Sequence, residues 1–137
     1  MKAFIVLSLV LSTSAFAASK RLITCKGTSS TVGYETFRIN ILRTEAGELK
    51  ANLSEGYTTM NTSETWKVQM VEAGSVIKIS NINKSALALE INKAKGRVVD
   101  DIDGAQGSVN LVHIAKPYMA PAVTYTITKG KLACRIE

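Results

Sequence analysis

The sequence predicts an all-β domain, an antiparallel meander of about eight to ten short strands that closes into a small barrel. Three observations support this fold class. Apolar and polar residues alternate along most of the chain, glycine-containing turns recur at roughly ten-residue intervals, and a cysteine stands near each end of the domain. Such alternation favours an antiparallel sheet, because parallel strands are buried on both faces. A β-sandwich is the alternative, since it also protects the edges of the sheet.

Residues 1–17 have the pattern of a cleaved signal peptide. Lys2 supplies a positive charge, residues 4–11 form an apolar run, and Ala15-Phe16-Ala17 matches a small-residue cleavage site. The run is too short for a transmembrane helix, which needs about 20 apolar residues. The sequence therefore predicts a periplasmic or secreted protein with one β domain, residues 18–137, and no transmembrane segment.

The strands are expected where apolar residues share one face. Phe37, Ile39 and Ile41 point to one side of the sheet, and the residues between them are polar. The other expected inward-facing sets are Leu49, Ala51 and Leu53; Trp66, Val68 and Met70; Ile77 and Ile79; Leu87, Leu89 and Ile91; Val109 and Leu111; and Val123, Tyr125 and Ile127. Residues 85–95 also have high helix propensity, but their apolar positions have the strand period, so we expect a strand there.

Turns are expected between these strands wherever glycine or a cluster of turn residues occurs. The expected turns contain Gly33, residues 45–48, residues 73–75, Lys95-Gly96, Asp103-Gly104 and Lys129-Gly130. Pro117 and Pro121 indicate a further loop at residues 116–121, because proline does not fit a central strand.

Cys25 and Cys134 are expected to form a disulfide that joins the first strand to the last. Exported proteins meet an oxidising compartment in which such pairs close. Cys25 has the same parity as Ile23, and Cys134 has the same parity as Leu132, so both sulfurs should face the core. A redox or zinc site is less well supported, because the sequence has no C-x-x-C motif and a single histidine.

The sequence contains few groups suited to catalysis and predicts a non-enzymatic protein without a cofactor. The single histidine, His113, has the parity of the core positions, and no G-x-S-x-G motif accompanies it. A pair of carboxylates is the remaining enzymatic alternative. Asp101 and Asp103 in the acidic turn 100–103 have the spacing of part of a calcium loop, but the closing glutamate is missing. A solvated turn is therefore expected, with a weak Ca²⁺ site as the alternative.

The charge balance favours an acidic partner. The sequence has 17 basic and 11 acidic residues and a formal net charge of +6. The basic residues are scattered and few aromatic residues face outward, so nucleic acid is not an expected partner. Two expected loops carry an aromatic ring and a thioether, Tyr57 with Met60 and Tyr118 with Met119, which suit contact with a protein. Thr124, Thr126 and Thr128 form a polar row that could line a binding surface, but threonine is also an ordinary residue on the solvent-exposed face of a strand.

These observations together predict a small exported binding protein that acts on a protein partner, as an inhibitor or as an envelope accessory. Two alternatives remain open from the sequence: a carrier of a small apolar ligand inside the barrel, and a structural component of the envelope. The packing of the barrel interior bears on the first alternative, because a carrier needs an empty cavity.

Overall fold

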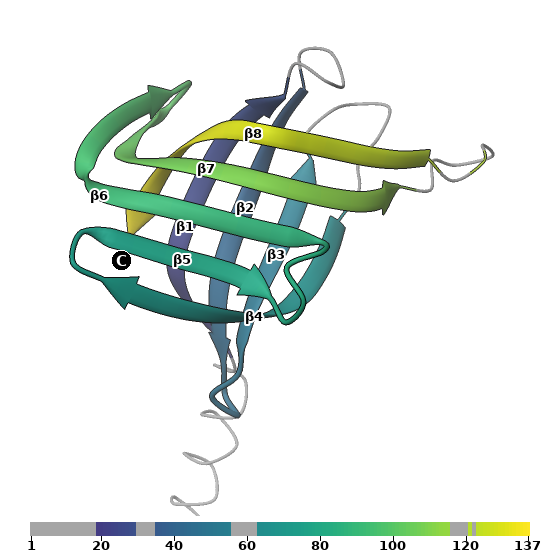
Figure 1. Cartoon of the computed structure of the whole chain (residues 1–137), viewed down its shortest axis with the longest axis horizontal. Helices are drawn as coiled ribbons and strands as arrows, with labels where there is room; N and C mark the ends of the chain where they lie inside the picture. The colour runs from purple at the N-terminus through teal and green to yellow at the C-terminus, as the bar shows by residue number, and fades with distance from the viewer. Residues whose placement is uncertain (1–18, 30–34, 56–62, 116–120, 122) are drawn as a thin grey trace, which may run out of the picture.

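Eight antiparallel strands form a closed barrel in the computed structural model, which describes residues 19–29, 35–55, 63–115, 121 and 123–137 (Figure 1). The strands are β1 (Ser19–Ser29), β2 (Glu35–Thr44), β3 (Leu49–Glu55), β4 (Ser63–Ala73), β5 (Val76–Asn81), β6 (Leu87–Val99), β7 (Ile102–Ala115) and β8 (Val123–Ile136). Each strand pairs with the next one in the sequence, and β8 pairs with β1. The predicted barrel is confirmed, and the chain does not form the alternative sandwich.

The segment with mixed helix and strand signals is a strand, as its apolar parity predicted. Leu87, Leu89 and Ile91 of β6 are buried, and Glu90 between them is exposed. A turn at residues 82–86 precedes the strand. Burial of one face by the barrel therefore decides the conformation over local helix propensity.

Two of the predicted glycine turns are present, at Gly47 (φ 85°) and at Gly74 (φ 60°). Three other predicted turns, at Gly96, Gly104 and Gly130, are wrong, because these residues lie inside β6, β7 and β8. The strands are consequently longer than expected, with 13 residues in β6 and 14 in each of β7 and β8. Because these three glycines do not divide the strands, the described chain has eight strands, the lowest number in the expected range of eight to ten.

The glycines inside these strands mark irregular pairing and close contacts. The β6–β7 register shifts between Asn92 and Gly96. A Cβ on Gly104 would overlap the backbone of Cys134, so β7 passes directly against β8 at this point. Small residues are needed where two backbones approach so closely.

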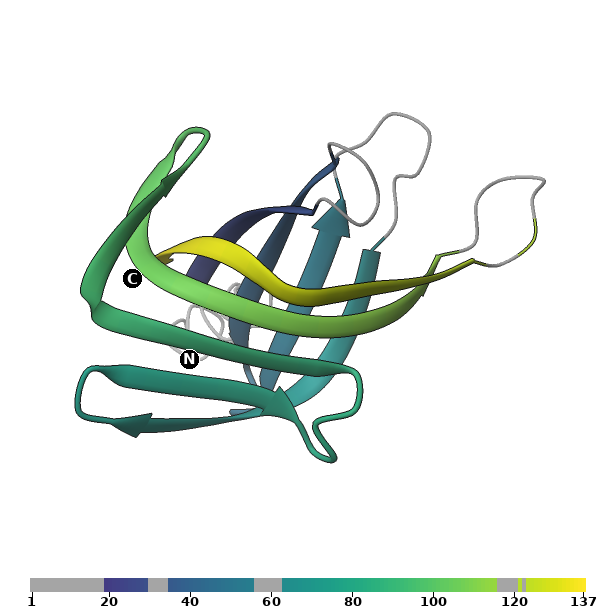
Figure 2. The same cartoon turned by 45° about the horizontal axis from the view of Figure 1, so that its top comes forward.

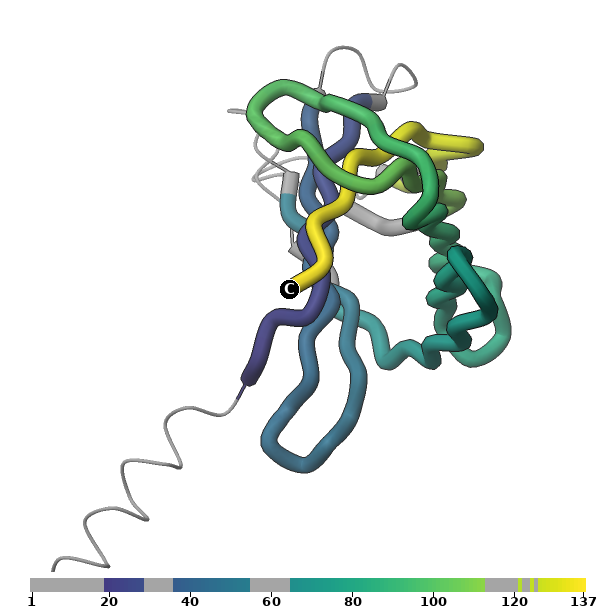
Figure 3. Tube along the Cα trace, turned by 90° about the vertical axis from the view of Figure 1, so that its left-hand side faces the viewer, coloured from purple at the N-terminus to yellow at the C-terminus, as the bar shows by residue number. Residues whose placement is uncertain are grey.

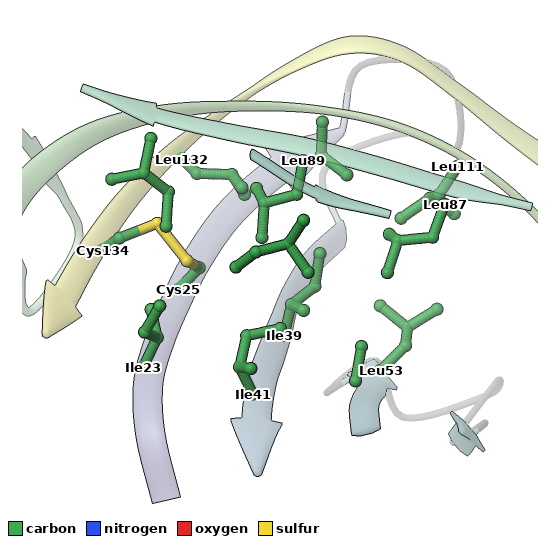
Figure 4. Packing of buried hydrophobic residues seen from close by; sticks show 14 of the residues in the cluster. Ile23, Cys25, Ile39, Ile41, Leu53, Leu87, Leu89, Leu111, Leu132 and Cys134 are labelled. Carbon is green, nitrogen blue, oxygen red and sulfur yellow. A yellow bond between two sulfur atoms is a disulfide. The ribbon is translucent and has the colours of Figure 1, made fainter. Parts of the chain in front are cut away.

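The interior of the barrel is filled by side chains from all the strands except β4 (Figure 4). None of the cluster members is more than 3% exposed. The cluster consists of Ile23, Cys25, Phe37, Ile39, Ile41, Ala51, Leu53, Ile77, Ile79, Leu87, Leu89, Ile91, Val109, Leu111, Ile127, Leu132 and Cys134. From β4, Trp66, Val68 and Met70 pack against this cluster while remaining partly exposed.

The predicted disulfide is present and lies inside this cluster (Figure 4). Cys25 of β1 and Cys134 of β8 are directly paired across the two strands, with 4.0 Å between their Cα atoms. The bond links positions 109 residues apart in the sequence. It joins the first strand to the last at the closure of the barrel and is compatible with an oxidising compartment.

Candidate functional site

The loop residues that the sequence offered as partner contacts, Tyr57, Met60, Tyr118 and Met119, lie outside the described residues. The side chain of His113 is also outside them. The candidate site is therefore built from the described surface of the barrel, beginning with the acidic turn.

The acidic turn is the tip of the β6–β7 hairpin, where Asp100 has a positive φ of 49°. The Asp101 carboxylate accepts a hydrogen bond from Lys26 Nζ at 2.5 Å and lies 3.7 Å from Arg38 Nη2. Asp100 lies 3.5 Å from the same Lys26 nitrogen. Asp103 is exposed, and its backbone oxygen faces Arg135 Nε at 3.5 Å. The structure thus places Asp101 against cations from β1 and β2.

No cluster of three His, Cys, Asp or Glu residues suited to a metal occurs in the part of the chain that the structure describes.

The ionic contacts of Asp101 shift the pKa values of both partners in the ion pair. The hydrogen bond from Lys26 lowers the pKa of Asp101, and the same bond raises the pKa of Lys26 against the opposing effect of desolvation. Both groups are thereby held in their charged forms.

The end of the β6–β7 hairpin folds over the outside of β8 (Figures 1 and 2). In Figure 3 its green tip reaches toward β1 and β2, in agreement with the ion pairs from Asp101. Arg97 Nη1 donates to the backbone oxygens of Gly107 and Leu132, at 2.7 and 3.3 Å. Ala133 is fully buried although its parity places it on the outer face, which agrees with cover by the hairpin end.

The outer face of β4 to β8 away from this hairpin end carries three adjoining hollows, which we call the outer hollows. The central hollow, about 170 Å³, is lined by Lys78, Ile79, Ser80, Lys84, Ala88, Leu89, Glu90, Ser108 and Asn110. A hollow of about 400 Å³ beside it shares Lys78 and Glu90 and adds Val71, Ala73 and Val76. A third, of about 290 Å³, shares Lys84 and Asn110 and includes Val112, Thr126 and Thr128.

The strand register explains why the central hollow forms. Lys78, Glu90 and Ser108 are directly opposite one another on β5, β6 and β7, and Ser80, Ala88 and Asn110 form the adjacent row. Directly opposed side chains on one face are neighbours, with Cβ atoms about 5 Å apart. Three of these six residues are small, so the longer side chains around them form walls above a low floor.

A tightly hydrogen-bonded loop brings Lys84 to the rim of the central hollow. Asn81 Oδ1 accepts hydrogen bonds from the backbone N–H groups of Ala86 and Leu87, at 3.2 and 3.0 Å. Asn83 Oδ1 accepts from both the N–H and the hydroxyl of Ser85. Lys84 itself has a φ of 57° and donates its N–H to the Asn81 carbonyl. Asparagine side chains thus replace backbone partners and fix the shape of the turn.

The outer hollows combine positive charge with exposed apolar surface. Their charged lining residues are Lys78, Lys84 and Glu90. Lys131 extends the row on β8, directly opposite Ser108. Val71 at one end is 62% exposed, and Ile82 in the loop next to Lys84 is 78% exposed. This composition suits a partner that presents both acidic and apolar groups.

No protein-family model, curated protein or solved structure matches the chain. Among the described residues there is no helix long and apolar enough to cross a membrane. The described strands therefore define the class by themselves: a disulfide-closed antiparallel β-barrel with a filled interior.

The sequence did not identify this surface, although it pointed out one row of residues that lies on it and interpreted that row as ordinary solvent-facing threonines. Thr126 and Thr128 of the predicted polar row line the third hollow. Lys78, Ser80 and Ala88 were not singled out, because each is an unremarkable outward-facing residue on its own strand. The available signal is the occurrence of small residues at outward positions of three successive strands, which becomes informative only when the register is known.

Proposed function

We propose that the chain is a small exported, non-enzymatic binding protein that acts on a protein partner through the outer hollows, as an inhibitor or as an envelope accessory. The observation that carries the proposal is a net-positive, hollowed outer face on a barrel whose interior is already filled. An acidic segment of the partner is the expected ligand, because the lysines on this face outnumber its glutamate.

The extent of the outer hollows suits a short peptide segment. They cross five neighbouring strands, and strand spacings of about 4.8 Å give a length of about 19 Å across the sheet. An extended chain of about six residues has this length. One loop or one extended segment of a folded protein can therefore contact all three hollows, with Val71 and Val112 available for apolar contacts near the two ends.

The packing of the core supports binding on the outside over carriage on the inside. Phe37, Leu89 and Ile127, which the sequence placed inward, are each 2% exposed and belong to one contiguous cluster. An eight-stranded barrel has an interior just wide enough for its side chains, so large apolar residues at these positions leave little room for a ligand.

Site-directed photo-crosslinking in the exporting cell tests the proposal. A benzophenone amino acid replaces Ser108 in the central hollow or, as the matched control, exposed Lys67 on the outer face of β4 beside β3. We expect a discrete protein adduct from position 108 that weakens when Lys78→Glu reverses one charge of the surface. Equal adducts from both positions, or none from either, would contradict binding through the outer hollows.

A further inference from the structure

We propose that the central hollow is a carboxylate pocket that receives the side chain of one aspartate or glutamate of the protein partner. This inference rests on the proposed function and specifies the chemistry of recognition at its centre. Lys78 and Lys84 supply the positive charge, and Ser80, Ser108 and Asn110 supply neutral hydrogen-bond donors.

Two of the neutral donors, Ser80 and Asn110, have hydrogens available to a ligand. Ser80 is only 9% exposed and lines the hollow, and no side-chain hydrogen bond to another described residue occupies its hydroxyl. Asn110 Oδ1 accepts a hydrogen bond from the Lys129 N–H at 2.7 Å. With its oxygen engaged in this way, Asn110 has its Nδ2 hydrogens to offer to an acceptor.

The central hollow is large enough for a single acidic side chain. A protein cavity of about 150 Å³ accommodates benzene, a molecule of six heavy atoms. The central hollow has a volume of about 170 Å³, so it accommodates the five heavy atoms of a glutamate side chain. The larger apolar hollow beside Lys78 then lies next to the residues that flank this glutamate in the partner.

Glu90 limits the affinity of the pocket and thereby provides a sensitive test. It stands directly between Lys78 and Ser108 in the register, and the ion pairs of the described residues do not include it. A carboxylate in the hollow is repelled by Glu90 and attracted by the two lysines. Removal of the glutamate charge should therefore strengthen binding, whereas loss of a merely structural residue would not.

The probes for the experiment are N-acetyl-glutamate N-methylamide and the matched glutamine compound. Amide NMR spectra of the disulfide-bonded domain are recorded during titration with each one at low salt. We expect the glutamate probe to give saturable shifts centred on the amides of Ser80, Ala88 and Ser108, and the glutamine probe to give none. Added salt should weaken the interaction, because these charges are exposed to solvent.

Four variants separate the pocket from general charge attraction. Removing one of the lysine charges in Lys78→Gln should weaken binding about fivefold, and Glu90→Gln should strengthen it by a similar factor. Lys20→Gln, which changes the net charge equally at the exposed start of β1, should have little effect. Ala88→Leu should abolish binding by filling the floor of the hollow without changing any charge.

Several outcomes would overturn the pocket: shifts spread over the surface, equal binding of the glutamine probe, or equal weakening by Lys20→Gln and Lys78→Gln. The lysine and glutamate variants keep the test decisive even when Ala88→Leu unfolds. Probe binding without a crosslinked protein would support the pocket and contradict the proposed function. A crosslinked protein without probe binding would preserve the function and remove the pocket.

Discussion

Breaking the Cys25–Cys134 disulfide should lower the free energy of unfolding by about 4–5 kcal/mol, since a cross-link between positions 109 residues apart strongly restricts the unfolded chain. Domains of this size are stable by about 5–15 kcal/mol, so the loss is about a quarter or more of the total. The bond also joins the first strand to the last, at the place where the barrel closes. Reduction should therefore yield a marginally stable domain.

Equilibrium urea unfolding of the oxidised and the reduced domain measures this difference. Trp66, the single tryptophan, is a suitable fluorescence probe because it lies partly buried against the core. The double variant Cys25→Ala/Cys134→Ala serves as a second reference. It should be somewhat less stable than the reduced protein, because it also lacks two sulfurs that are at most 1% exposed.

The size of the loss decides between two accounts of barrel closure. A loss of less than about 1 kcal/mol on reduction would refute the chain-entropy argument. It would show that the backbone ladder from Ile23↔Ile136 to Thr28↔Lys131 closes the barrel without the covalent bond. An unchanged urea midpoint with a changed slope would instead indicate residual structure in the reduced unfolded state.

The other predictions concern the hairpin tip, the crossing of β7 over β8, and export. The pKa of Asp101 lies below its ordinary value of 3.8, so the stability that its charge contributes is complete above pH 3.8 and is lost as the pH falls through the lower pKa of the folded state. In Asp101→Asn, the urea midpoint should therefore fall less steeply at acidic pH than it does in the unchanged protein. The raised pKa of Lys26 has the opposite sign, so its contribution disappears only as the pH rises through a value above 10.5. Gly104→Ala should cost at least about 2 kcal/mol in the same assay, whereas Gly96→Ala, whose Cβ meets another atom no closer than 3.7 Å, should be nearly neutral. Mass spectrometry of the exported protein should find Ala18 as its first residue; a retained residue 1–17 segment would contradict the predicted cleavage.

The fold class was predictable because the apolar residues that alternate along the sequence are the residues buried inside the barrel. Each inward residue of β2, Phe37, Ile39 and Ile41, is at most 2% exposed, as its parity required. The disulfide followed from the same parity, since both cysteines stand at inward positions of their strands. A period of two that continues through a helix-prone segment such as residues 87–91 correctly indicated a strand.

The three wrong turn predictions all rest on glycine, because glycine occurs at turns, at register shifts and where two strands approach closely. Gly74 forms a tight turn with positive φ, whereas Gly104 is required by the proximity of the Cys134 backbone. Nothing in the neighbouring sequence distinguishes these two cases. The difference arises from a strand that is distant in the sequence, so only the assembled barrel reveals it.

The candidate site depends on the register in the same way. Ser80, Ala88 and Ser108 occupy outward positions of three strands, where a small polar or neutral residue is ordinary. Pairing places Ser80 opposite Ala88, and it places Ser108 one row away, so the three side chains form a common floor. Because the described core residues are packed together inside the barrel, the proposed function assigns ligand selectivity to such gaps in the outer layer of side chains. Charge alone would attract many acidic proteins, whereas under the proposed function a floor bounded by Lys78 and Lys84 would select those that can place a carboxylate in it.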